Sequence, residues 1–143
     1  MKRTVRGILD RKGEQIWSVH PDSTVFEALK VMAEHNIGAV VVMEETRLAG
    51  ILSERDYARK VILEKRSSAD TKVADIMTSL VTTVTPEDEV DRCMTLMSSG
   101  RFRHLPVLHD GRVVGVISIG DVVRSIIDSQ QSLITDLERY ITQ

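Results

Sequence analysis

Cysteine, aromatic residues and long apolar runs are scarce in this sequence. A single cysteine, Cys93, among 143 residues excludes an internal disulfide and predicts a small buried side chain in a reduced compartment. Aromatic residues make up only 3% and the net charge is −2, whereas a nucleic-acid surface needs a basic face or stacking rings. No apolar run approaches the roughly 20 residues that span a bilayer, and no apolar stretch follows the basic N-terminus. These absences predict a cytoplasmic protein with no nucleic-acid and no membrane partner.

What the sequence does contain is a repeat. The heptapeptide GILSERD at residues 50–56 returns 65 residues later as GVISIGD at residues 115–121. With this offset, residues 16–62 align with 81–127 without a gap, and most apolar positions meet apolar positions. We therefore expect two halves with the same fold.

Each half has the same order of predicted elements. A short β-branched run is followed by apolar residues at helical spacing, then by two apolar runs joined by a turn, and then by a second helix. The predicted strands are residues 16–19, 39–43 and 48–52 in the first half, and 81–84, 105–108 and 113–117 in the second. So small a sheet cannot bury its apolar face alone. The predicted fold class is α/β (α+β), with two pseudo-symmetric βαββα repeats packed sheet to sheet.

A polar connector at residues 65–71 separates the halves. The predicted divisions are 1–70 for the first repeat with its lead-in and connector, 71–128 for the second repeat, and 129–143 for a C-terminal helix. Ile134, Leu137 and Ile141 would line one face of that helix, and such a stripe is typical of core packing or of an oligomer contact.

The Gly-x-x-Ser-x-x-Asp motif occurs in both halves, where a strand leads into a helix. Its simplest interpretation is a helix cap, in which the Ser oxygen accepts a backbone N–H and the acid stands in the first turn. The motif also fits a nucleotide: a glycine lets a ligand approach the backbone, a hydroxyl at a helix N-terminus suits phosphate, and a carboxylate suits the two ribose hydroxyls. The residues concerned are Gly50, Ser53 and Asp56 in the first half and Gly115, Ser118 and Asp121 in the second.

The segment before the hairpin differs between the halves. Arg103 and His104 precede a buried strand in the second half, where they are either a solvated loop or a clamp for phosphate. The first half has Ile37, Gly38 and Ala39 in the corresponding segment, without charge. The two sites are therefore not expected to be equivalent.

Together these residues resemble the paired cystathionine-β-synthase (CBS) domain, or Bateman module. The resemblance rests on VADIMT at 73–78, on RHLPV at 103–107 and on both Gly-x-x-Ser-x-x-Asp motifs, and it covers nearly the whole chain. It implies that adenosine compounds bind in clefts of a pseudo-symmetric module, with the motif Ser on phosphate and the motif Asp on ribose. It also implies an apolar sandwich for the base. The candidates for that sandwich are Ile16, Ile37, Ala39, Val81, Leu105 and Pro106.

Members of this family usually pair into a disk-like dimer and regulate an enzyme, channel or transporter. We therefore expect a homodimer that senses an adenine nucleotide and acts on a separate, unknown effector protein. AMP is the leading candidate ligand, followed by ADP, ATP or NAD(H). The alternative is a structural dimerisation module with degenerate ligand sites. Neither Ser53 nor Ser118 has a histidine at a spacing that suggests a base, and the four histidines lack metal-ligand spacing. We thus expect no enzyme, no catalytic residue, no catalytic cofactor and no metal site.

Overall fold

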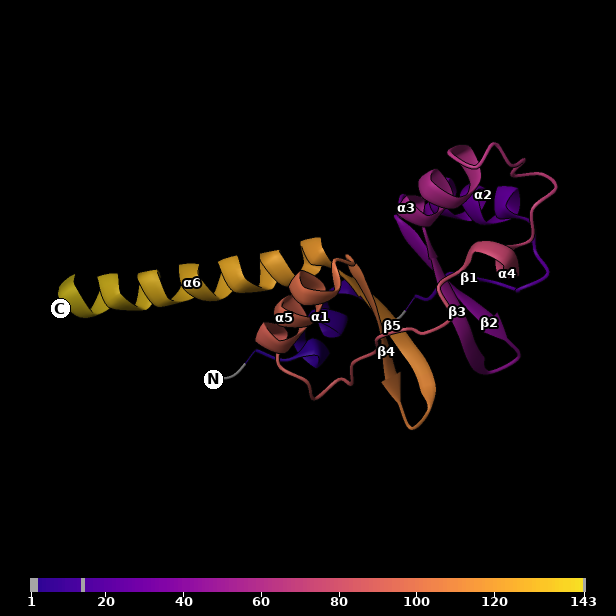
Figure 1. Ribbon diagram of the computed structural model, residues 1–143. Coiled ribbons are helices and arrows are strands. Elements are labelled where there is room, and N and C mark those ends of the chain that lie inside the picture. The colour runs from indigo at the N-terminus through magenta and orange to yellow at the C-terminus, as the bar shows by residue number, and fades with distance from the viewer. Residues whose placement is uncertain (1–2, 14, 143) are drawn as a thin grey trace. The chain divides into compact units, whose positions relative to one another are not determined.

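The computed structural model describes residues 3–13 and 15–142 of the chain. It contains mixed helices and strands with two small sheets, which confirms the predicted fold class (Figure 1). The chain forms two compact units. Unit 1 comprises the described residues within 1–14, 83–108 and 115–143, and unit 2 comprises those within 15–82 and 109–114. The predicted packing of one sheet on the other stays a prediction.

Unit 2 contains the three-stranded sheet. Strand β1 (Ser18–Val19) pairs parallel with β2 (Ala39–Glu44), and β2 pairs antiparallel with β3 (Arg47–Ser53). The predicted hairpin of the first half is thereby confirmed. The strand predicted over residues 16–19 is shorter, because only its last two residues pair with β2.

Helices cover this sheet. Helix α2 (Val25–His35) begins where the Thr24 side chain accepts a hydrogen bond from the Glu27 amide, and it ends at Asn36 in the left-handed conformation. The short helix α3 (Glu54–Tyr57) continues as the π-helix η1 (Ala58–Ile62), so the helix predicted to about residue 65 ends earlier. Helix α4 (Val73–Ile76) completes unit 2. The core of this unit consists of Val25, Ala28, Met32, Val40, Val42, Leu52, Val61, Val73 and Ile76.

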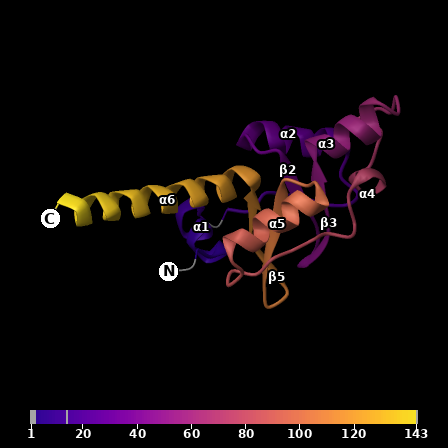
Figure 2. The same ribbon diagram turned by 60° about the vertical axis from the view of Figure 1, so that its left-hand side comes forward.

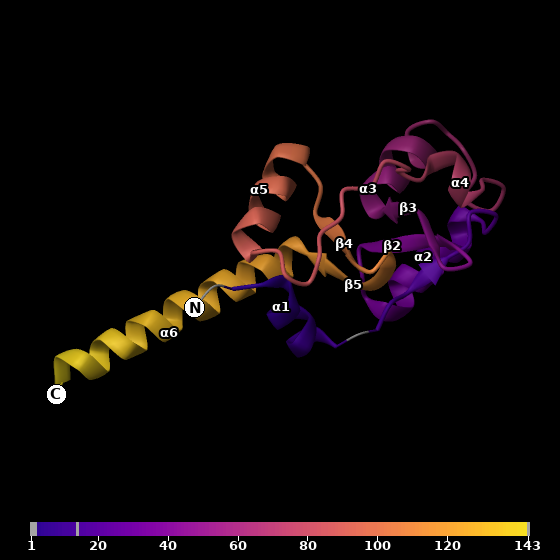
Figure 3. The same ribbon diagram turned by 90° about the horizontal axis from the view of Figure 1, so that it is seen from below.

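Unit 1 is richer in helix. It holds α1 (Val5–Lys12), α5 (Val90–Gly100) and α6 (Ile119–Thr142), together with most of β4 (His104–His109) and β5 (Arg112–Ser118). Figure 2 and Figure 3 show α1 and α5 beside the first turns of α6. Helix α6 joins two predicted segments, the helix to about 128 and the C-terminal helix, into one helix of 24 residues.

Two details of unit 1 concern earlier predictions. The strand predicted over residues 81–84 contracts to an isolated bridge between Val84 and Val107, because only Val84 exchanges hydrogen bonds with β4. The Cys93 side chain is fully buried, as predicted, and this burial raises the pKa of its thiol to about 11, with a further increase from Asp88.

The two lead-in helices make equivalent contacts. The Val5 amide of α1 donates to the Asp88 carbonyl at 2.9 Å, and the Val73 amide of α4 donates to the Ser23 carbonyl at 2.8 Å. Asp88 and Ser23 are related by the 65-residue offset, so each lead-in packs at the start of a repeat. Helix α1 precedes the first repeat in the sequence but contacts the second repeat. Helix α4 precedes the second repeat but contacts the first. The predicted sequence boundary between residues 70 and 71 stays a prediction.

Candidate functional site

In each unit, the Ser and Asp of the Gly-x-x-Ser-x-x-Asp motif form a corner where a strand leads into a helix. The corner of unit 2, Ser53 and Asp56, is a complete capping box at the start of α3. The Ser53 hydroxyl accepts a hydrogen bond from the Asp56 amide at 3.1 Å, and Asp56 Oδ2 accepts one from the Ser53 amide at 3.0 Å. Lys60 lies one turn later, and its Nζ is 3.4 Å from Asp56 Oδ1. The same Nζ donates a hydrogen bond to the Ile76 carbonyl at 3.0 Å. The carboxylate therefore has partners within its own unit.

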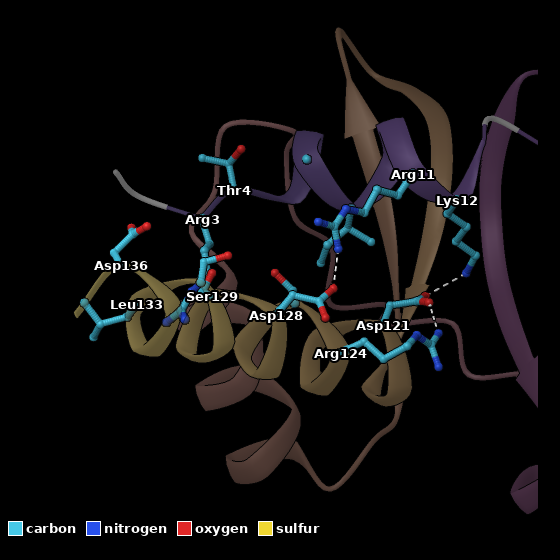
Figure 4. A pocket seen from close by; sticks show the side chains of 14 residues that line it. Arg3, Thr4, Arg11, Lys12, Asp121, Arg124, Asp128, Ser129, Leu133 and Asp136 are labelled. Atoms are coloured by element: carbon cyan, nitrogen blue, oxygen red, sulfur yellow. Dashed lines mark hydrogen bonds and ion pairs between the residues drawn. The ribbon is translucent and has the colours of Figure 1, made fainter. Parts of the chain in front are cut away.

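The corner of unit 1 repeats this box and adds two cations. Asp121 Oδ2 accepts hydrogen bonds from the Ser118 amide at 2.8 Å and from Lys12 Nζ at 2.8 Å, while Arg124 donates to Oδ1 at 2.7 Å (Figure 4). Lys12 also donates to the Val116 carbonyl at 2.7 Å. The corner thus ties α1, β5 and the first turn of α6 together.

The Asp121 carboxylate is held in its ionised form. Its side chain is only 8% exposed, and this burial alone would raise its pKa. Hydrogen bonds from Lys12 and from the Ser118 amide outweigh the burial, so the pKa of Asp121 lies below its usual value. An ionised carboxylate beside two cations can accept hydroxyl donors, and the cations can bind an anion.

Arg103 and His104 lie beside the start of α6. The Ile119 amide donates to the Arg103 carbonyl at 2.8 Å, and in unit 2 the Glu54 amide donates to the Gly38 carbonyl at 3.0 Å. The structure therefore brings Arg103 and His104 next to the Ser118 corner, as the phosphate-clamp hypothesis requires. Burial lowers the pKa of His104, and Lys12 lowers it further, so its imidazole is neutral at pH 7.

The two motif glycines face the chain itself. A Cβ on Gly50 would lie 2.8 Å from the Thr78 carbonyl oxygen and 2.8 Å from Met77 Sδ, and a Cβ on Gly115 would lie 2.5 Å from Leu9 Cδ2. The close approach expected at these glycines is therefore made by lead-in residues. Approach of a ligand to the same backbone stays a prediction.

The candidates for the base sandwich differ in accessibility. Ile16, Ile37 and Val81 are half-buried and belong to unit 2, the unit of Ser53. Leu105, Pro106 and Ala39 are buried, Leu105 completely, and act first as core residues. Pro106 also accepts the Val84 amide through its carbonyl. Their role in ligand binding stays a prediction.

Three cations at these corners were not predicted from the sequence. Arg124 stands three residues after Asp121 and Lys60 four residues after Asp56, so helical spacing could have revealed both. Lys12 comes from a helix 109 residues away from Asp121, and no local signal announces it. A groove of about 870 Å³ between α1 and α6 extends from Lys12 and Asp121 along both helices (Figure 4).

Within residues 3–13 and 15–142, no group of three His, Cys, Asp or Glu side chains is placed to hold a metal ion. Over the same residues, no helix combines the length and the apolar character required to cross a membrane.

Comparison with known proteins identifies the family. The CBS domain family model matches residues 5–63 and 73–128, so the chain belongs to the CBS domain family and carries the domain twice. The mitochondrial CBS domain-containing protein CBSX3 of Arabidopsis thaliana is 44% identical over 96% of this chain and 71% of its own length.

Solved structures agree with this assignment. A CBS-domain protein of Burkholderia ambifaria, which has been proposed to act in signal transduction, is 48% identical with a TM-score of 0.85, covering 89% of this chain and 96% of that chain. The CBS domain pair of protein MJ0100, solved with 5′-methylthioadenosine and S-adenosyl-L-methionine, is 27% identical with a TM-score of 0.79, covering 90% and 99%. The predicted family and its tandem arrangement are confirmed.

Proposed function

We propose that this chain is a regulatory module that binds an adenine nucleotide, with the Ser118 corner of unit 1 as the phosphate- and ribose-binding part. The observation that carries the proposal is the buried, ionised Asp121 carboxylate at the first turn of α6, between Lys12 and Arg124. A ribose offers two hydroxyl donors to such a carboxylate, and phosphate oxygens accept from the neighbouring cations. The likeness to MJ0100, whose structure contains two adenosine compounds, supports the adenosine class.

The charges around the corner favour ligands that carry phosphate. Arg103 is exposed beside the helix start, and the Arg124 side chain is 70% exposed, so both guanidinium groups can turn toward an anion. AMP, ADP, ATP and NAD(H) offer a phosphate, whereas 5′-methylthioadenosine does not. The Ser53 corner has Gly38 and Ala39 in place of Arg103 and His104, so we expect it to bind phosphate more weakly.

Ligand binding would act through a shift between conformations that a separate effector distinguishes. The homodimer, the effector and the cytoplasmic location stay predictions, and so does the expectation that the chain is no enzyme. Prolonged incubation of purified protein with ATP or NAD tests the last point, because the appearance of any product would contradict it.

Titration calorimetry and thermal shift with AMP, ADP, ATP, NAD, NADH and 5′-methylthioadenosine, with GMP as a control, test the proposal. At about 100 times its Kd, a ligand that binds only the folded state adds about 2.7 kcal/mol to the free energy of unfolding. Asp121→Asn should weaken binding roughly 10-fold or more, because a hydrogen bond to a charged group contributes about 1.5–3 kcal/mol. The matched variant Asp56→Asn should weaken it less.

A structural module is the second candidate. The observation in its favour is that both corner carboxylates already form ion pairs. Asp56 pairs with Lys60, and Asp121 pairs with Lys12 and Arg124. In that case the whole panel leaves the melting temperature unchanged, while Asp121→Asn still lowers stability through the lost ion pairs with Lys12 and Arg124. A flat panel with folded protein would therefore contradict nucleotide binding and leave the corners as caps.

A further inference from the structure

The C-terminal half of α6 carries an apolar stripe that its own unit leaves exposed. Residues 129–142 lie beyond the family match, which ends at residue 128, and Figures 1, 2 and 3 show this part of α6 extending away from α1 and α5. A helix with such a stripe gains stability mainly by packing it against a partner. The exposed fractions are 59% for Leu133, 48% for Ile134, 52% for Leu137, 82% for Tyr140 and 78% for Ile141.

The stripe follows the heptad spacing of a coiled coil. With Ile134 at position a, the a positions are Ile127, Ile134 and Ile141, and the d positions are Val123, Gln130 and Leu137. Val123 is 38% exposed and Ile127 56%, so the stripe also runs along the first turns of α6. It thus continues over residues 123–141, about 28 Å at 1.5 Å per residue.

The residues that flank the seam determine the orientation of a partner helix. The e positions are Arg124, Gln131 and Glu138, all polar, and the g positions are Ile126, Leu133 and Tyr140, all largely apolar. In a parallel pair each g residue faces an e residue of the other helix, so Leu133 would face Glu138. In an antiparallel pair g faces g and e faces e. Apolar residues then meet apolar ones, and charges of opposite sign meet each other.

We propose that α6 pairs antiparallel with α6 of a second copy of this chain. Ile127 then packs against Leu137 of the second copy, and Val123 packs against its Ile141. Leu133 meets its own counterpart at the twofold axis. Arg124 meets Glu138 of the second copy, and because a guanidinium has five N–H donors, Arg124 can keep its bond to Asp121. Gln130 opposite Ile134 is the one polar residue in the seam.

The charges on the same helix disfavour a lipid surface as the occupant. A helix that lies on a membrane carries mostly lysine and arginine on its polar face, whereas residues 123–141 have Asp128, Asp136 and Glu138 against Arg124 and Arg139. The stripe and the flanking residues are self-complementary, which selects a second copy over an unrelated chain. This dimer contact shares Arg124 with the nucleotide corner, but the apolar seam itself lies outside that corner and does not depend on ligand binding.

Sedimentation equilibrium of the full chain over a concentration series tests the pairing. Ile134→Glu places a charge in the seam and should raise the dimer Kd about 100-fold or more, while Ser132→Glu adds the same charge to the same helix at position f and should leave it unchanged. Circular dichroism confirms that both variants are folded. A parent that stays monomeric throughout the series, or an Ile134→Glu variant with the mass of the parent, overturns the proposal.

Disulfide trapping tests the orientation. Leu133→Cys lies at the twofold axis of an antiparallel pair and should form a covalent dimer on mild oxidation, whereas Ile134→Cys should not, because its antiparallel neighbour is Gln130. Cys93 is fully buried and does not compete. The reverse result, with only Ile134→Cys cross-linking, would indicate a parallel pair and overturn the antiparallel assignment. A monomeric purified chain that captures a different protein through this stripe would also overturn it.

Discussion

The contact between Lys12 and Asp121 yields the sharpest stability prediction. Lys12→Met keeps much of the aliphatic chain but removes the ammonium, which donates to Asp121 Oδ2 at 2.8 Å and to the Val116 carbonyl at 2.7 Å. A hydrogen bond to a charged group contributes about 1.5–3 kcal/mol. The Lys12 side chain is 39% exposed, so solvent screening reduces the expected loss to about 1–2 kcal/mol. This corresponds to a decrease in Tm of about 3–8 °C.

The same variant should change how stability depends on pH. The folded-state pKa of Asp121 is depressed, so its contribution is present above the unfolded-state pKa of about 3.9 and is lost as pH falls through the folded-state value. Without Lys12 the depression is smaller. The deficit of Lys12→Met relative to the parent should therefore be full at neutral pH and should shrink as pH falls below about 4. Urea unfolding at a series of pH values measures it.

A matched variant and a double-mutant cycle isolate the interaction. Lys60 is the lysine that pairs with Asp56 in unit 2, but its Nζ is 3.4 Å from Asp56 Oδ1, so Lys60→Met should be less destabilising. A cycle of Lys12→Met with Asp121→Asn should give a coupling energy of about 1 kcal/mol or more. A Lys12→Met variant that is as stable as the parent at neutral pH, or whose deficit stays constant on acidification, would refute a stabilising ion pair between Lys12 and Asp121.

Three further predictions concern backbone approach, the thiol and the core. Gly50→Ala should lower the free energy of unfolding in urea more than Gly115→Ala does. A Cβ on Gly50 meets the Thr78 carbonyl, whereas the Leu9 side chain can rotate away from a Cβ on Gly115. Equal losses of stability in the two variants would contradict this. Cys93 should resist thiol reagents at pH 8 until the protein unfolds. Because burial raises its folded-state pKa to about 11, stability should fall as pH rises from about 9 toward that value, and a flat alkaline profile would argue against burial. Leu105→Ala should destabilise unit 1 by about 2–5 kcal/mol, since Leu105 is fully buried; a loss below about 1 kcal/mol would show that the site relaxes.

Local rules in the sequence account for much of the fold. The 65-residue repeat, the alternation of apolar runs and turns, and the Ser-x-x-Asp boxes depend on residues close together in the chain, and the structure contains hairpins, helices and both caps where these patterns predicted them. The strand at residues 81–84 was wrong in extent, because β-branched composition does not decide whether a partner strand is in reach.

The site depends more on contacts between distant segments. The corner serines and acids were evident from the motif, and Arg103 and His104 from their place before a buried strand. Lys12 was not evident, because 109 residues separate it from Asp121 and only the packing of α1 against the second repeat brings it there. The same packing fills the space beside Gly115 with Leu9, where sequence reasoning placed a ligand.

The repeat, the order of elements, the caps and the family resemblance could all be predicted from the amino-acid sequence, because each is encoded in the short-range spacing of residue types. Tertiary structure alone decided which lead-in helix accompanies which repeat and which cations neutralise each corner carboxylate. It also decided which face of α6 stays exposed. These outcomes depend on side chains from remote segments competing for the same buried positions, and that competition is settled only when the chain packs.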